Sequence, residues 1–165
     1  MRRWEAERLS MKRVLLSIWR VMPFWAQRMA SFLIRPHFQV AAGALVFNDQ
    51  GQLLLCRHSY RRLHPWGLPG GDLKYGEDPQ AGVRRELWEE TGLTAAETRL
   101  LLVESSQEIH QVSLTYLCDK IKGSFVPNDE VLEIRYFETR ELPGLFDEQR
   151  LTIEKCLAIL KTETR

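Results

Sequence analysis

The chain has 165 residues and a mass of 19.3 kDa, which predicts one domain with a single hydrophobic core rather than a multidomain protein. Its formal charge of +1 is unevenly spread: residues 1–38 carry eight Lys and Arg against two Glu (+6), and the remainder carries fifteen against twenty Asp and Glu (−5). The acidic remainder argues against a nucleic-acid platform, and three widely spaced cysteines without histidines in ligand spacing argue against a zinc site or a disulfide framework.

Residues 1–37 predict a basic amphipathic helical extension, separate from a domain over residues 38–165. Residues 14–34 are rich in apolar side chains, but Arg20 and Arg28 interrupt them and Pro23 bends or splits any helix. A membrane span and a signal peptide are both poor fits, so one or two short amphipathic helices are expected. The favoured interpretation is that they pack on the domain or form a homodimer with a second subunit. Peripheral contact with an anionic membrane surface is the alternative.

The domain itself mixes strands with helices. Strands are expected at 39–47, 52–57, 99–105, 111–118 and 133–138. Helical periodicity marks residues 146–161, with Leu151, Cys156, Leu157 and Leu160 as candidate buried positions. Together with a helix between the second and third strands, this pattern predicts an α/β fold in which helices cover both faces of a sheet.

That intervening helix, of about a dozen residues between the start signal Pro79 and the stop signal Gly92, carries an unusual acidic face. Glu86, Glu89 and Glu90 are spaced i, i+3 and i+4 and share the face. Three carboxylates there repel one another unless a hard divalent cation, which takes oxygen ligands, sits among them. The alternative is a solvated acidic helix face, which is the usual interpretation of a charge cluster.

The same segment resembles the Nudix box without a departure. The pattern is glycine, five residues, glutamate, seven residues, then Arg-Glu-aliphatic-any-Glu-Glu-any-Gly-aliphatic. It is met here by Gly71, Glu77, Arg85, Glu86, Leu87, Glu89, Glu90, Gly92 and Leu93. At residue frequencies of roughly 5–7%, a chance match has a probability on the order of 10⁻¹⁰ per starting position. The resemblance spans about residues 38–160. It implies a Nudix hydrolase whose fold is an α/β/α sandwich with a mixed β-sheet.

The resemblance also implies roles for the box residues. Those that resemble ligands of Mg²⁺, with Mn²⁺ as a substitute, are Gly70 through its carbonyl, Glu86, Glu89 and Glu90. Arg85 and Glu77 resemble the pair that orients the helix and the ligands. The general base varies within the family and is either a box glutamate or a carboxylate from the loop before the last strand. Glu130 is the first candidate in that loop and Glu133 the second, with an ordinary loop charge as the alternative.

Four residues that are not among the fixed positions of the box are candidates for binding the substrate. Arg57 and Arg61, in a basic loop before the box, could clamp phosphates bidentately, and Arg57 is favoured because it ends a strand. Trp66 and Tyr75 could stack on a nucleobase, although an aromatic residue beside the core more often serves packing. For each arginine, a solvated loop charge is an equally good interpretation.

The activity implied by the resemblance is hydrolysis of a phosphoanhydride bond in a nucleoside diphosphate linked to another group. The cysteine pattern makes a reducing cytoplasm the expected location. Ile109 and His110 stand where the ADP-ribose and diadenosine polyphosphate groups of the family have proline and tyrosine. A nucleoside triphosphate or small nucleotide derivative is therefore the working hypothesis, and dinucleoside polyphosphates and nucleotide sugars remain open. A non-catalytic nucleotide-binding module would be expected to lose box carboxylates. An isomerase on the same fold is disfavoured by the intact box.

Overall fold

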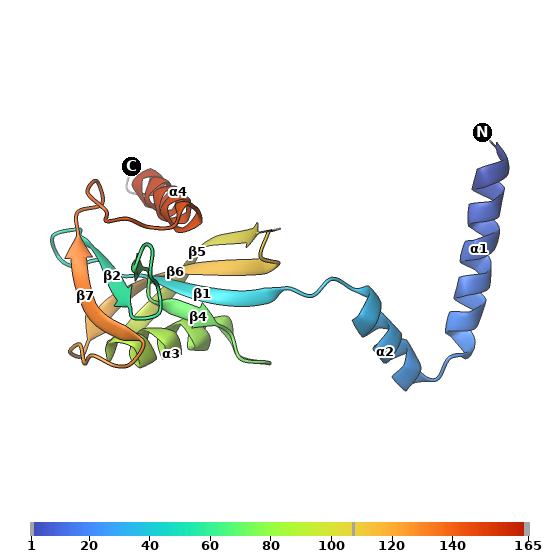
Figure 1. Cartoon of the computed structure of the whole chain (residues 1–165), viewed down its shortest axis with the longest axis horizontal. Helices are drawn as coiled ribbons and strands as arrows, with labels where there is room; N and C mark the ends of the chain where they lie inside the picture. The colour runs from blue at the N-terminus through green and yellow to red at the C-terminus, as the bar shows by residue number, and fades with distance from the viewer. Residues whose placement is uncertain (1, 107, 164–165) are drawn as a thin grey trace. The chain divides into compact units, whose positions relative to one another are not determined.

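The computed structural model describes residues 2–106 and 108–163, with side chains from Lys12 onward. It divides into a helical unit that ends at His37 and a larger unit that begins at Phe38. The helical unit contains α1 (Arg2–Val21) and α2 (Phe24–Ile34), labelled in Figure 1. Two helices are therefore present, and α1, with 20 residues, is longer than the short helices that the sequence predicted.

The turn between α1 and α2 is held by one side chain. Pro23 precedes α2 with extended backbone, and the side-chain amide of Gln27 donates to the carbonyl oxygens of Trp19 at 2.9 Å and Met22 at 3.1 Å. These carbonyls lie at the end of α1, where backbone acceptors lack the usual helical partners, so Gln27 caps one helix from the other; the Trp19 carbonyl also accepts from the Met22 N–H at 3.4 Å. No helix among the described residues is long and apolar enough to cross a membrane.

The described residues of the larger unit form seven strands and two helices. The strands are β1 (Gln39–Leu45), β2 (Leu53–His58), β3 (Trp66–Gly67), β4 (Gly70–Asp72), β5 (Thr94–Ser106), β6 (Gln111–Lys122) and β7 (Val131–Phe137). The helices are α3 (Pro79–Thr91) and α4 (Asp147–Glu163). The strands form one sheet in the order β4-β1-β6-β5 and another in the order β3-β2-β7. Strands β1 and β6 run parallel and the other pairs antiparallel, so the mixed α/β fold is confirmed, with its strands divided between two sheets.

Strand β1 and the residue that follows it separate two hydrophobic clusters. Ala44 and Val46 belong to the cluster that includes Val83 and Leu87 of α3. Leu45, between them, belongs to the cluster that includes Ile153 and Cys156 of α4. Because successive side chains of an extended chain point to opposite sides, α3 and α4 cover opposite faces, as Figure 1 shows. Leu151 was a candidate for the buried face of α4, but it is 50% exposed because Ile153 takes the core position instead.

Helix α3 begins and ends where local chemistry requires. The Asp78 carboxylate accepts hydrogen bonds from the backbone N–H groups of Gln80 and Ala81, both at 3.0 Å, and Pro79 occupies the first helical position. Gly92 ends the helix at φ 73°, a left-handed conformation that disfavours side chains, and a Cβ there would lie 2.8 Å from the Ser124 carbonyl oxygen. The predicted start and stop of the acidic helix are both confirmed.

Candidate functional site

The acidic face of α3 is organised around one guanidinium group. Arg85 binds both carboxylate oxygens of Glu77 at 2.8 Å, and its Nη1 contacts Glu86 at 2.5 Å and Glu89 at 2.9 Å. The Glu77 carboxylate also accepts from the backbone N–H of Lys74 at 2.8 Å. These hydrogen bonds, that from Arg85 first, lower the pKa of Glu77 to about 2. The predicted pair of Arg85 and Glu77 is thus in direct contact, and Arg85 draws two further box glutamates to itself.

Glu90 differs from its neighbours because it is buried. It accepts a hydrogen bond from the backbone N–H of Gly70 at 2.8 Å, and its other oxygen lies 3.7 Å from Nδ1 of His58. Burial raises the pKa of Glu90 to about 7, the Gly70 hydrogen bond opposes that rise, and the charges of Glu86 and Glu130 add to it. A buried carboxylate beside two others needs a nearby cation to stay ionised.

The loop before β7 is fastened to the end of α3 by Asn128. Its side-chain amide donates to the carbonyl oxygens of Glu89 at 3.0 Å and Glu90 at 3.2 Å. Its side-chain oxygen accepts from the backbone N–H groups of Glu130 at 2.9 Å and Val131 at 2.7 Å. Asn128 therefore brings Glu130, the predicted general base, close enough to Glu90 for the two charges to interact.

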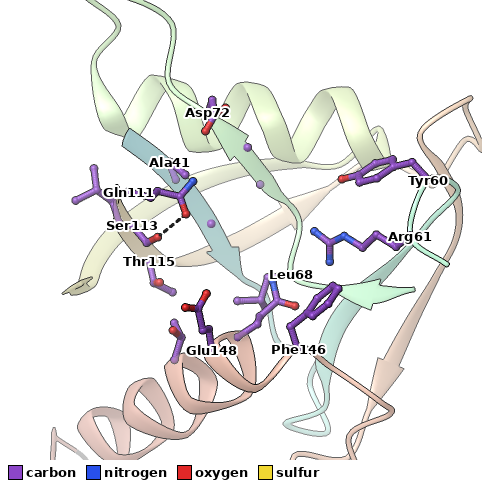
Figure 2. A pocket seen from close by; sticks show the side chains of 17 residues that line it. Ala41, Tyr60, Arg61, Leu68, Asp72, Gln111, Ser113, Thr115, Phe146 and Glu148 are labelled. Atoms are coloured by element: carbon purple, nitrogen blue, oxygen red, sulfur yellow. Dashed lines mark hydrogen bonds between the residues drawn. The ribbon is translucent and has the colours of Figure 1, made fainter. Parts of the chain in front are cut away.

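A cavity of about 440 Å³ opens beside Gly70 and Gly71 (Figure 2). A Cβ on Gly71 would lie 2.8–3.1 Å from the Glu86 carboxyl group, so the missing side chain lets backbone and carboxylate approach each other. Figure 2 shows Tyr60, Arg61 and Phe146 together on one side of the cavity. Polar side chains from β6 and α4 lie on the opposite side: Gln111, Ser113, Thr115 and Glu148.

Arg61 is the cationic side chain among the described residues that line this cavity. Its carbon Cζ lies 5.7 Å from the ring centroid of Tyr60 and 5.9 Å from that of Phe146. Nη1 of Arg61 is buried without a hydrogen-bond partner, and so is the side-chain oxygen of Gln149, which also lines the cavity. Buried polar atoms without partners cost free energy, so this wall is suited to a ligand that supplies an acceptor and a donor.

The other three predicted substrate residues lie away from the cavity. Arg57 is 3.9 Å from the Glu133 carboxylate, and Trp66 packs edge-on against Phe137 with ring centroids 5.0 Å apart. Tyr75 is fully exposed in the loop before α3. None of the three lines the cavity, and their contact with a substrate stays a prediction.

The donor chemistry of the α3 face fits a hard divalent cation. Glu86, Glu89 and Glu90 offer carboxylate oxygens. A cation bound there would neutralise negative charge on the buried Glu90 and its neighbour Glu86. No group of three or more His, Cys, Asp or Glu side chains among the described residues is arranged to hold a metal ion. In this structure Arg85 holds Glu86 and Glu89, while Glu90 is bound by Gly70.

Sequence reasoning missed three residues of this site. Asn128 is a single asparagine in a loop, and its contact with α3 arises only from the tertiary fold. His58 follows an apolar run in β2 and is 2% exposed, with both ring nitrogens lacking a hydrogen-bond partner. Gln149 lies in the first turns of α4. The run LLLC before Arg57 and His58 was a usable signal, since a strand buried on both faces also buries the polar residue at its end.

Comparison with known proteins agrees with this geometry. The family model of the NUDIX domain matches residues 37–157. The chain is 32% identical over 120 residues to the ADP-ribose pyrophosphatase of Methanocaldococcus jannaschii, covering 70% of this chain and 71% of that protein. Two further curated relatives match over 56% and 38% of their own length.

Solved structures share the fold. The MutT NUDIX hydrolase from Burkholderia pseudomallei superposes with a TM-score of 0.64 at 28% identity, covering 72% of this chain and 98% of that one. A UDP-X diphosphatase superposes with a TM-score of 0.65 at 22% identity, over 97% of this chain and 84% of that one.

Proposed function

This chain belongs to the Nudix hydrolase family, and on that premise we propose that it hydrolyses a phosphoanhydride bond in a nucleoside diphosphate linked to a further group, with a nucleoside triphosphate or a small nucleotide derivative as substrate. One observation carries the proposal. The cavity that contains the unpaired Arg61 guanidinium begins at Gly70 and Gly71, directly against the acidic face of α3. An anionic substrate and the hydrolytic groups would meet at that glycine pair.

The box residues divide into groups that hold a cation and groups that orient them. The predicted ligands of Mg²⁺, or of Mn²⁺ in its place, are Glu86, Glu89, Glu90 and the Gly70 carbonyl. A bound divalent ion would supply charge stabilisation on the phosphoryl oxygens and an acidified water. Arg85 and Glu77 orient the helix, and Asn128 positions Glu130 to accept a proton from the attacking water.

The cavity wall would bind the rest of the substrate. Arg61 neutralises a phosphate and is better placed than Arg57, whose guanidinium is near Glu133. Tyr60 and Phe146 flank Arg61 and offer aromatic surface for a base, and Gln149 offers an amide. These groups differ from Trp66 and Tyr75, which the sequence alone suggested. Three free, buried cysteines fit the reducing cytoplasm that the proposal assumes.

A nucleotide sugar or a dinucleoside polyphosphate is the second candidate substrate. The M. jannaschii relative is named for ADP-ribose, a nucleoside diphosphate joined to a sugar, and it aligns with 70% of this chain. The polar wall of Gln111, Ser113 and Thr115 provides hydroxyl and amide groups that would suit a sugar.

The test is hydrolysis of a panel of substrates with Mg²⁺, read by liquid chromatography with mass detection. The panel contains canonical and oxidised nucleoside triphosphates, dinucleoside polyphosphates, nucleotide sugars and ADP-ribose. The wild type should cleave one class, Glu89→Gln should not, and Arg61→Gln should raise KM more than it lowers kcat. Cleavage of nucleotide sugars alone would replace the first substrate with the second. A folded protein that binds nucleotides but cleaves none would indicate a non-catalytic binding module.

A further inference from the structure

Helix α2 exposes a continuous apolar stripe. Trp25, Met29 and Leu33 are spaced i, i+4 and i+8 and therefore share one side of the helix, where they are 66%, 56% and 75% exposed. No residue of α2 is buried. Arg28, at i+3 from Trp25, lies beside this stripe, and Arg35 follows the last residue of the helix as its C-cap. An eleven-residue helix with this much uncovered apolar surface requires a partner.

Helix α1 repeats the arrangement. Leu15, Ile18 and Val21 are 61%, 51% and 82% exposed, while Arg13 and Arg20, seven residues apart, lie on a common side. The two helices are fastened together by Gln27, which contacts the last turn of α1. The helical unit therefore presents two helices that combine exposed apolar side chains with neighbouring arginines.

The charge of this segment identifies the partner. No Asp or Glu occurs between Glu7 and Asp49, while this stretch carries six cations: Arg8, Lys12, Arg13, Arg20, Arg28 and Arg35. A second copy of residues 8–48 would bring six more cations and no anion to an interface between the two helical units. An anionic lipid surface covers apolar side chains and attracts Lys and Arg at the same time.

Arginines and aromatic side chains also meet in one depression of the helical unit. Arg28 and Arg35 line a hollow of about 460 Å³ together with Trp19, Phe24 and Phe32. Arginine binds phosphate groups, and tryptophan is enriched at the depth of lipid headgroups. We propose that residues 12–35 dock the protein peripherally on an anionic phospholipid bilayer, with the apolar stripes of α1 and α2 at the headgroup boundary and their arginines at the lipid phosphates.

The experiment uses the full chain and two kinds of vesicle, one of phosphatidylcholine and one of phosphatidylcholine mixed with phosphatidylglycerol. The protein should sediment with the mixed vesicles, and added salt should release it. The double variant Trp25→Ser/Leu33→Ser should bind about a hundredfold more weakly, since burying each large apolar side chain contributes a factor of about ten or more. Arg28→Gln/Arg35→Gln should lose binding to the mixed vesicles and its salt dependence.

A control pair removes two exposed apolar side chains from the larger unit. Leu151 and Val126, in the larger unit, are 50% and 64% exposed, and Leu151→Ser/Val126→Ser should leave vesicle binding unchanged. Brominated lipids should quench tryptophan fluorescence in the wild type and less so in Trp25→Phe. The proposal is overturned if the protein binds neither kind of vesicle or binds both equally at all salt concentrations. It is also overturned if the protein forms a dimer that covers these helices and does not bind vesicles.

Discussion

Replacing Asn128 with alanine should separate the positioning of Glu130 from the stability of the fold. The change removes four side-chain hydrogen bonds: two join the loop before β7 to the end of α3, and two hold the backbone of Glu130 and Val131. Each hydrogen bond contributes about 0.5–1.5 kcal/mol, and water replaces some of them in the variant. The free energy of unfolding should therefore fall by about 2–4 kcal/mol. Because Glu130 would no longer be held near Glu90, kcat should also fall by about 10- to 100-fold.

Asn48 provides the matched control for Asn128. Its side chain makes three comparable hydrogen bonds, to the N–H groups of Gln50 at 3.1 Å and Gln52 at 2.9 Å and to the Gln52 side chain at 2.7 Å. It lies in the turn between β1 and β2, away from α3 and the cavity. Asn48→Ala should therefore lower stability while leaving kcat unchanged.

The assay combines urea unfolding, followed by tryptophan fluorescence, with turnover at a temperature where both variants are folded. Both variants should show a lower unfolding midpoint. Equal kcat in the Asn128 and Asn48 variants would refute the assignment of Asn128 as a positioning residue, because stability alone would then explain its effect.

Three further predictions concern the same region. Glu130→Gln should lower kcat by about 10²–10⁴ without changing stability, measured by initial rates with Mg²⁺, and near-full turnover would remove Glu130 from the mechanism. Because burial raises the pKa of Glu90 from 4.5 to about 7, the metal-free protein binds an extra proton between those values. Relative to Glu90→Gln, the stability of the wild type should therefore fall as the pH rises from about 4.5 to 7, measured as the difference between the urea midpoints of the two proteins. Burial lowers the pKa of His58 to about 4, which changes stability in the opposite direction in both proteins. Gly92→Ala should lower the free energy of unfolding, measured with urea, by about 2–4 kcal/mol, because the backbone there is left-handed and the new Cβ would meet the Ser124 carbonyl. Gly51→Ala, at φ 77° with open space around it, should lower it by about 1–2 kcal/mol.

The sequence predicted those parts of the structure whose causes are local. Pro79 and Gly92 mark the ends of α3 because proline at the first turn and glycine after the last satisfy requirements of the helix backbone itself. The pairing of Arg85 with Glu77 was expected from the family pattern and is present. Strands β1, β2, β6 and β7 carry apolar runs long enough to be recognised from composition.

The parts that escaped prediction depend on distant contacts. Strands β3 and β4 have two and three residues with glycines in both, too short for an alternating pattern. In α4, Leu151 and Ile153 are equally apolar, and only the packing against Leu53 and Leu55 decides that Ile153 is the buried one. Arg61 and Arg57 are equally basic, and the difference between them is the neighbouring Glu133 carboxylate, which β7 supplies.

The guanidinium of Arg85 has a consequence for how this protein matures. It already pairs with Glu77, Glu86 and Glu89 and offsets part of their negative charge, so α3, which carries Glu86 and Glu89, can form without an ion. Zinc-finger chains, by contrast, remain unfolded until their ion arrives. This chain would reach its native fold without bound metal, and an ion that bound later would displace Arg85 from the carboxylates instead of nucleating the fold. The supply of metal would then govern the catalytic rate of the protein without changing the amount of folded protein.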